Sequence, residues 1–250
     1  MKKIIYILFA VITFSVNAQK NSVLFEQGNT LYNNGNYKDA ISKYEEIIKN
    51  GEHSSALYYN LGNAHYKLNN IAPSIYYFEK ALQLSPNDQE IKNNIAFARN
   101  MTIDAIDTVP EVGFSKSINS ISGTMNFDGW AITSIVCVVL FVVLFIGYYF
   151  VYNTSRKRIL FISGMGFLIF AGITLGLAFH QENLVNNNNP AIVFAKESQV
   201  KSEPNLRSAE AFKLHEGTKV QILDTVNNWK KIKLSDGKSG WIPSQDIKAL

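Results

Sequence analysis

The sequence predicts a multidomain protein that joins an α-helical solenoid, a two-helix transmembrane hairpin and a small all-β barrel. Three observations predict this fold class. The N-terminal part repeats itself at an offset of 34 residues, which is a period of paired-helix repeats. Two long segments in the middle of the chain carry no charged residue. The C-terminal part contains short strand-like runs separated by turn residues.

The N-terminus has the features of an export signal. Lys2 and Lys3 precede an apolar stretch at residues 4–16, and Ala18 supplies a small residue at the expected cleavage point. The apolar stretch is short for a membrane span. We therefore expect residues 1–18 to be a signal peptide, with an uncleaved membrane anchor as the alternative. In either case the segment that follows is exported.

Two uncharged runs predict transmembrane helices. Residues 130–152 and residues 159–179 are each long enough to cross the ~30 Å of hydrocarbon in a bilayer. Trp130 stands at one end of the first run, where aromatic side chains are expected at the membrane interface. Two buried helices of a soluble core would not combine this length with a complete lack of charge.

The short connection between the two runs predicts their orientation. Residues 153–158 contain Arg156, Lys157 and Arg158, and basic residues of short loops stay on the cytoplasmic side. The turn is therefore expected in the cytoplasm, with both flanking domains outside, in the periplasm of a bacterial inner membrane. This orientation agrees with the export signal, which is independent of it.

The 34-residue offset relates two helical repeats within residues 19–100. The matching positions are Gly28 with Gly62, Asn29 with Asn63, Tyr32 with Tyr66, Asn36 with Asn70, Ile41 with Ile75, Tyr44 with Phe78, and Glu45 with Glu79. Gly62 is small where two helices would cross, and Pro73 suits the first turn of a helix. A further helix after Pro86 would be either a solvating cap or half of a third repeat.

Residues 55–88 closely resemble a tetratricopeptide repeat, and residues 21–50 resemble a slightly degenerate copy. The resemblance implies a concave groove lined by the first helix of each repeat. The residues at these positions are Phe25, Asn29, Tyr32, Tyr59, Asn63 and Tyr66. The asparagines would hydrogen-bond an extended peptide and the rings would hold its side chains; the alternative is that the rings only pack. No basic clamp for a C-terminal carboxylate is expected, because Phe25 stands where such clamps often have lysine.

Residues 101–129 form a linker in which Phe114, Ile118, Ile121 and Met125 recur at helical spacing. The linker is either a short helix on the bilayer surface, interrupted at Gly123, or a plain tether. A second, polar linker follows the hairpin at residues 180–190.

Residues 191–250 predict the barrel, because turn residues such as Asp236-Gly237 separate strand-like runs. This stretch resembles bacterial SH3-like domains. The residues that carry the resemblance are Ser202, Pro204, Leu214, Glu216, Gly217, Thr218, Trp229, Asp236, Gly237, Gly240, Trp241, Ile242 and Pro243. The resemblance places Trp229 in a groove with Pro243 nearby, where such domains bind peptides or cell-wall fragments. The tyrosine-rich opening motif is missing, so a purely structural tryptophan is the alternative.

Composition and motifs argue against an enzyme. The net charge of +4 is spread over the chain, which does not favour nucleic acid as a partner. The single cysteine and the four histidines form no metal-ligand spacing, and no phosphate loop or nucleophile motif is present. We expect a binding protein that is not an enzyme and uses neither a cofactor nor a metal.

The order of modules resembles the BatE-type proteins of the Bacteroides aerotolerance group. The resemblance implies an inner-membrane scaffold beside Bat proteins with von Willebrand-type domains and a MoxR-type ATPase. We therefore expect a scaffold that binds membrane or periplasmic proteins through the repeat groove. A peptidoglycan receptor acting through the SH3-like domain is the alternative, and a cell-wall hydrolase is the least favoured interpretation. The predicted cytoplasmic turn of about six residues is too small for an effector, which disfavours the receptor.

Overall fold

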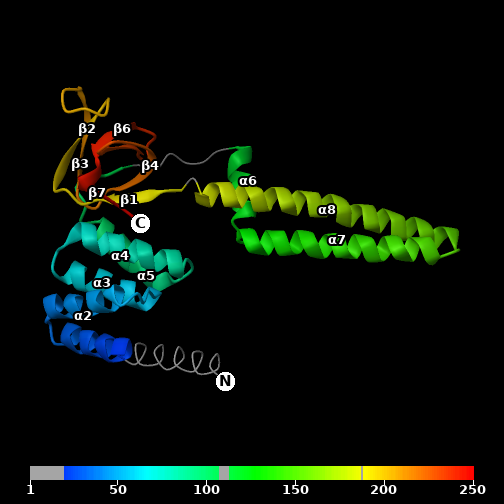
Figure 1. The fold of residues 1–250 in the computed structure, drawn as a ribbon, viewed down its shortest axis with the longest axis horizontal. Helices are drawn as coiled ribbons and strands as arrows, with labels where there is room; N and C mark the ends of the chain where they lie inside the picture. The colour runs from blue at the N-terminus through cyan, green and yellow to red at the C-terminus, as the bar shows by residue number, and fades with distance from the viewer. Residues whose placement is uncertain (1–19, 107–112, 187) are drawn as a thin grey trace, which may run out of the picture. The chain divides into compact units, whose positions relative to one another are not determined.

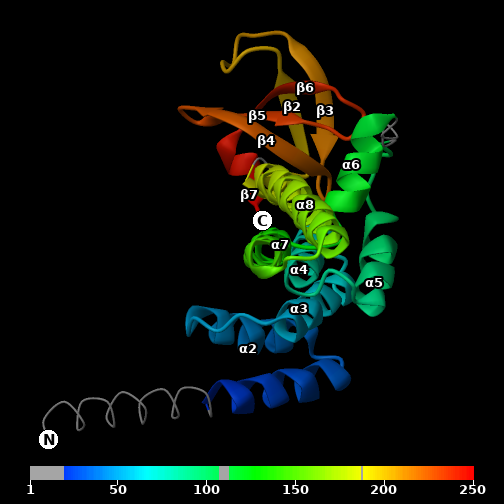
Figure 2. The same ribbon diagram turned by 90° about the vertical axis from the view of Figure 1, so that its right-hand side faces the viewer.

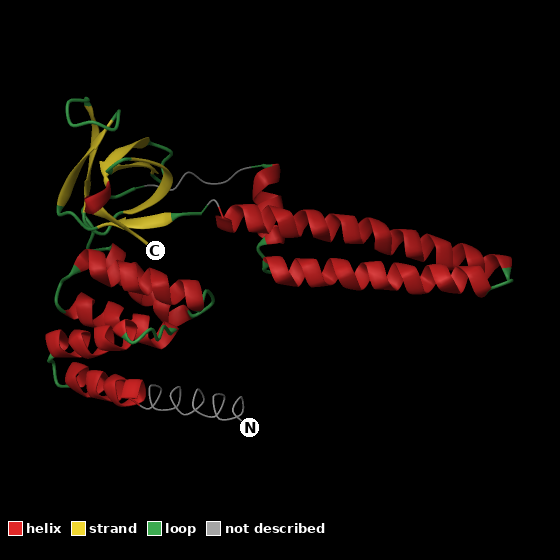
Figure 3. Ribbon diagram, viewed as in Figure 1, coloured by secondary structure: helices red, strands yellow, loops and turns green. Residues whose placement is uncertain are grey.

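The computed structural model describes residues 20–106, 113–186 and 188–250; the predicted signal peptide lies outside them. The chain divides into two compact units. The first unit combines residues 1–108 with residues 189–250, and the second spans residues 109–188. Helices form the N-terminal and middle parts of the chain, whereas the strands lie in its C-terminal part (Figure 3). The predicted combination of helical repeat, apolar hairpin and small β domain is confirmed.

The helical part of the first unit is a stack of consecutive helices (Figure 1). A helix at residues 20–33 packs on α2 through Gly28 and Tyr44 in the first repeat, and α3 pairs with α4 in the second. The bounds are α2 Tyr37–Lys49, α3 Ser55–Lys67, α4 Ile71–Leu84 and α5 Gln89–Arg99. Asp88 caps α5, because its carboxylate accepts hydrogen bonds from the backbone N–H groups of Glu90 and Ile91.

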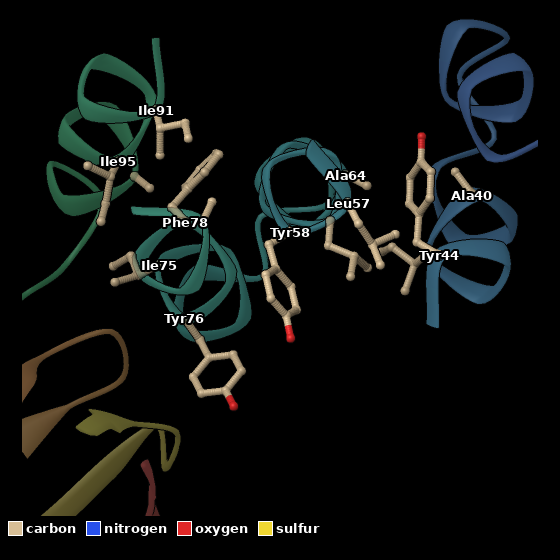
Figure 4. Close-up of a cluster of buried hydrophobic side chains, with 14 of the residues drawn as sticks. Ala40, Tyr44, Leu57, Tyr58, Ala64, Ile75, Tyr76, Phe78, Ile91 and Ile95 are labelled. Carbon is tan, nitrogen blue, oxygen red and sulfur yellow. The ribbon is translucent and has the colours of Figure 1, made fainter. Parts of the chain in front are cut away.

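Two glycines let the helices of each repeat approach closely. A Cβ atom at Gly62 would lie 2.6 Å from the ring of Phe78, and one at Gly28 would overlap the ring of Tyr44. Both rings are almost completely buried between the helices (Figure 4). The 34-residue offset therefore relates two equivalent contacts in the core, Gly28 with Tyr44 in the first repeat and Gly62 with Phe78 in the second.

The β part of the first unit is one seven-stranded antiparallel sheet with strand order β3-β2-β6-β5-β4-β1-β7. The bounds are β1 Pro190–Val193, β2 Glu197–Lys201, β3 Glu210–His215, β4 Lys219–Val226, β5 Trp229–Lys233, β6 Ser239–Pro243 and β7 Ile247–Ala249. Its hairpin turns use left-handed residues, Asn227 with φ 51° and Gly237 with φ 92°. Val200, Leu214 and Ile232 lie in its buried core.

The second unit contains α6 Phe114–Ser122, α7 Phe127–Phe150 and α8 Thr154–Asn186. Both α7 and α8 are long and apolar enough to cross a membrane. They lie side by side along their length (Figures 1 and 2). The hydroxyl of Ser134 on α7 donates a hydrogen bond to the carbonyl of Ala171 on α8, at 2.9 Å.

The ends of these helices differ from the predicted spans. Helix α8 begins at Thr154, so that Arg156, Lys157 and Arg158 lie in its first turn rather than in a loop. The side chain of Asn153 caps this turn by accepting hydrogen bonds from backbone N–H groups. At its other end α8 continues past Phe179 to Asn186, because residues 180–189 contain neither proline nor glycine.

The predicted surface helix is present as α6, and it ends at Gly123. It packs on the hairpin, since His180 of α8 hydrogen-bonds Asn119 at 2.9 Å. Trp130 is 8% exposed, and its indole N–H donates to the carbonyl of Ser122 at 2.9 Å. Trp130 therefore anchors α6 to α7, and its position at the membrane interface stays a prediction.

Candidate functional site

A cavity on the helical repeat brings together four of the six predicted groove residues. It has a volume of about 250 Å³. The residues that line it are Tyr32, Tyr59, Asn63, Tyr66, Lys67, Phe78, Asn94 and Phe97, and we call them the repeat groove. They come from the helix at residues 20–33 and from α3, α4 and α5. The aromatic rings, together with two amides and one amine, make a surface that fits a peptide side chain and its flanking backbone.

The other two predicted residues lie elsewhere. Phe25 lines a separate cavity of about 210 Å³ that includes Glu52 and Leu57. Asn29 is held by the core, because its amide oxygen accepts hydrogen bonds from the Tyr44 hydroxyl at 2.7 Å and the Asn60 amide at 2.8 Å. Asn29 therefore ties the two repeats together.

The side chain of Asn63 is oriented by its neighbours in the groove. Its amide oxygen accepts a hydrogen bond from the amide of Asn94 at 3.0 Å, which orients the side chain. The amide of Asn63 also hydrogen-bonds the Tyr59 hydroxyl. An amide nitrogen carries two N–H groups, so a second one can donate to a peptide carbonyl. The geometry supports a role for Asn63 in holding the backbone of a bound peptide.

Helix α5 contributes groove residues that sequence reasoning missed. The amide of Asn94 also donates to the Tyr59 hydroxyl at 2.7 Å, and that hydroxyl donates to Glu90 at 2.6 Å. Phe97 is 60% exposed beside them. The 34-residue offset carries the signal, because it extends from Asn29 through Asn63 to Phe97. The third residue of this 34-residue series, Phe97, therefore carries an exposed ring where the first two carry an amide.

The groove tyrosines are neutral hydrogen-bonding groups. Burial raises the pKa of Tyr32 above its ordinary value. Burial also raises the pKa of Tyr59, and the hydrogen bond to the carboxylate of Glu90 raises it further. Both hydroxyls therefore stay protonated at physiological pH. Lys67 is the cation of the groove lining, so acidic groups on a ligand are favoured at that end.

The second candidate surface lies on the β domain. The antiparallel register pairs Trp229 of β5 with Pro243 of β6, so the two predicted residues are direct neighbours. They line a cavity of about 530 Å³ together with Leu206, which is 81% exposed. Asn228, Ser244 and Gln245 complete the lining with polar groups. An apolar floor with polar edges suits a peptide or a sugar–peptide fragment.

The topology residues form a basic first turn on α8. The ammonium of Lys157 lies 5.2 Å from the ring centroid of Tyr148 on α7, which is within cation–π distance.

In the part of the chain that the structure describes, no group of three or more His, Cys, Asp or Glu side chains could hold a metal ion.

These features define a class of protein: a chain with two apolar helices that carries two binding modules, a paired-helix repeat and a small β domain. Comparison with family models assigns both modules. Residues 25–89 match the Tetratricopeptide repeat model, and residues 197–248 match the Bacterial SH3 domain model. Modules of these families typically bind proteins or peptidoglycan.

Two known proteins are similar to parts of this chain. Sperm-associated antigen 1 of Mus musculus is 36% identical over 76 residues, which is 30% of this chain and 8% of that relative. The chain thus spans less than a tenth of the curated relative it matches. A crystal structure of YrrB, described as a TPR protein with an unusual peptide-binding site, aligns over 66% of this chain and 76% of that chain. The TM-score is 0.31 and the sequence identity is 15%.

Proposed function

We propose that this protein is a non-enzymatic scaffold of the bacterial inner membrane that binds envelope proteins through its repeat groove. The observation that carries the proposal is the exposed ring of Phe97 beside the oriented amide of Asn63. An aromatic anchor and a backbone donor are the two elements that recognition of an extended peptide needs. The partner is therefore a protein segment with an apolar side chain.

The proposed location is the periplasmic face of the inner membrane. The basic first turn of α8, with Arg156, Lys157 and Arg158, supports a cytoplasmic end for the hairpin. The signal peptide proposed at residues 1–18 supports export of the repeat. Both modules then face the same compartment, where they meet envelope proteins.

The proposed partners follow from the order of modules. This order resembles that of BatE-type proteins of the Bacteroides aerotolerance group, which supports a place in a Bat stress complex. The groove would then hold a segment of a Bat protein with a von Willebrand-type domain. A partner segment with a carboxylate next to its apolar side chain is favoured, because Lys67 lines one end of the groove.

Replacing Phe97 with alanine is expected to weaken capture of the groove partner about tenfold, because a buried aromatic anchor contributes at least ~1.4 kcal/mol to binding. The measurement is cross-linking in intact membranes, followed by quantification of the attached chains by mass spectrometry. Leu84→Ala is the matched control, since Leu84 is 54% exposed on α4 and does not line the groove. Equal recovery of partners from the Phe97 and Leu84 variants would exclude the groove as the binding site.

The alternative function is binding of peptidoglycan by the SH3-like domain, favoured by the cavity at Trp229 and Pro243. If it operates, Trp229→Ala should reduce binding of the detergent-solubilised protein to purified peptidoglycan about tenfold, whereas Phe97→Ala should not. Co-sedimentation with peptidoglycan measures this difference. If Trp229→Ala binds peptidoglycan as well as the unchanged protein, the ring of Trp229 has only a structural role.

A further inference from the structure

The SH3-like domain and the helical repeat share one apolar core. Ile192 of β1 is completely buried among the repeat helices, in the same cluster as Ile75 and Phe78. The ring of Phe194 meets the ring of Tyr76 on α4 edge to face, with centroids 5.7 Å apart. Segments separated by more than a hundred residues therefore remove each other's apolar surface from water.

Charged groups hold the same interface. The carboxylate of Asp104, just after α5, accepts three hydrogen bonds from the β domain. The donors are the backbone N–H of His215 at 2.7 Å, its ring Nδ1 at 2.7 Å and the hydroxyl of Thr218 at 2.6 Å. Burial alone would raise the pKa of Asp104, but these hydrogen bonds outweigh it and hold the pKa below its usual value. Asp104 therefore binds the turn between β3 and β4 as a carboxylate.

A second carboxylate joins cations from both modules. Glu79 on α4 is nearly buried, and it pairs with Arg99 of the repeat and with Lys219 of β4. The Lys219 amine lies 2.7 Å from the Glu79 carboxylate. The ammonium of Lys248 also lies 4.3 Å from the ring centroid of Tyr76. A buried carboxylate needs cationic partners, so separation of the modules would remove Lys219 and leave the charge of Glu79 paired with Arg99 alone.

The closest approach is at Gly217, in the turn between β3 and β4. A Cβ atom there would lie 2.8 Å from Thr102, 2.9 Å from Ile71 and 3.0 Å from Ile75. Gly217 also has φ 88°, which favours glycine. Glycine is therefore favoured at this turn for two reasons, the positive φ of its backbone and the closeness of the α4 side chains.

We propose that the SH3-like domain is the built-in terminal cap of the repeat, so that the two modules act as one rigid binding body. It occupies the α4 surface on which a further repeat or a separate protein would otherwise stack. A partner is thereby directed to the groove and to the Trp229 cavity. The shared core also requires both modules to lie on the same side of the membrane. The shared core places the modules together independently of the charges of Arg156, Lys157 and Arg158.

A pair of glycine variants tests the cap. Gly217→Val and Gly237→Val impose the same kind of backbone strain, because both glycines have positive φ, but a Cβ atom at Gly237 meets nothing within 4 Å. Only Gly217→Val should speed hydrogen exchange of the α4 amides in the full-length protein, by about tenfold or more. Unchanged exchange in α4, or an equal increase in both variants, would overturn the proposal.

A disulfide trap tests the same contact in the membrane without disturbing Gly217. With Cys137 replaced by serine, the pair Asp104→Cys and Thr218→Cys should oxidise to an intramolecular disulfide, because the two side chains touch. The control pair, Asp104→Cys with Thr225→Cys, places the second thiol toward the far end of β4 and should stay reduced. Non-reducing electrophoresis of intact membranes distinguishes them. Failure of the first pair to oxidise, or equal oxidation of both, contradicts the cap.

Discussion

Replacing Phe78 with alanine is expected to lower the free energy of unfolding of the helical repeat by about 3–5 kcal/mol. The side chain is 1% exposed, and its ring fills the space left by Gly62 on the facing helix. Its ring centroid also lies 5.9 Å from that of Tyr59, so the ring supports the floor of the groove. Since domains of this size are stable by only about 5–15 kcal/mol, most of the stability would be lost.

Chemical denaturation of the full-length protein in detergent, followed by circular dichroism, measures this loss. Phe97→Ala removes the same side chain from an exposed position and should change stability by no more than about 0.5 kcal/mol. The two variants therefore separate the structural ring from the ligand-binding ring. Similar unfolding midpoints for both would show that Phe78 does not hold the repeats together.

Acidification is expected to destabilise the repeat through His65. Burial lowers the pKa of His65 to about 4, and repulsion by Lys248 adds to this shift. The ring stacks on Tyr77 with centroids 5.5 Å apart, and its Nε2 atom has no hydrogen-bond partner among the described residues. The site therefore accommodates the neutral imidazole and resists the charged form.

The sign of the pH effect follows from the two states. The unfolded chain has the ordinary histidine pKa of 6.5, so on acidification it binds a proton before the folded protein does. The stabilisation is complete above pH 6.5 and is lost as the pH falls from 6.5 to about 4. A difference of this size corresponds to about 3 kcal/mol.

Denaturation at a series of pH values between 7 and 4 measures this loss. His65→Gln should remove most of the slope, because glutamine does not titrate. His53→Gln is the control, since His53 lies on the exposed loop before α3 and should leave the slope intact. A slope that persists in the His65 variant would assign the effect to another group.

The sequence predicted the groove only in part. Tyr32, Tyr59, Asn63 and Tyr66 line one cavity because a fixed repeat period places equivalent residues on equivalent helix faces, and their role in peptide binding stays a prediction. Asn29 occupies the expected face, but its amide is taken by Tyr44 and Asn60. Which hydrogen bonds an amide makes depends on neighbours from other helices, and a repeat pattern does not specify them.

The spans were predicted more accurately than their ends. Length and lack of charge identify α7 and α8, because the bilayer sets both requirements. The position of Trp130 depends instead on how α6 packs, which sequence periodicity does not report. The signal peptide at residues 1–18 and the cytoplasmic position of Arg156, Lys157 and Arg158 stay predictions.

The sequence by itself determined the modules of this protein: two paired-helix repeats, two apolar helices and a small β domain. Each depends on local patterns, namely a repeat period, an apolar length and turn residues such as Gly237. Only the tertiary structure decided that Phe97 joins the groove and that Gly217 and Asp104 hold the β domain against α4. These contacts join surfaces from distant parts of the chain, and complementarity between such surfaces has no periodic signature in one sequence.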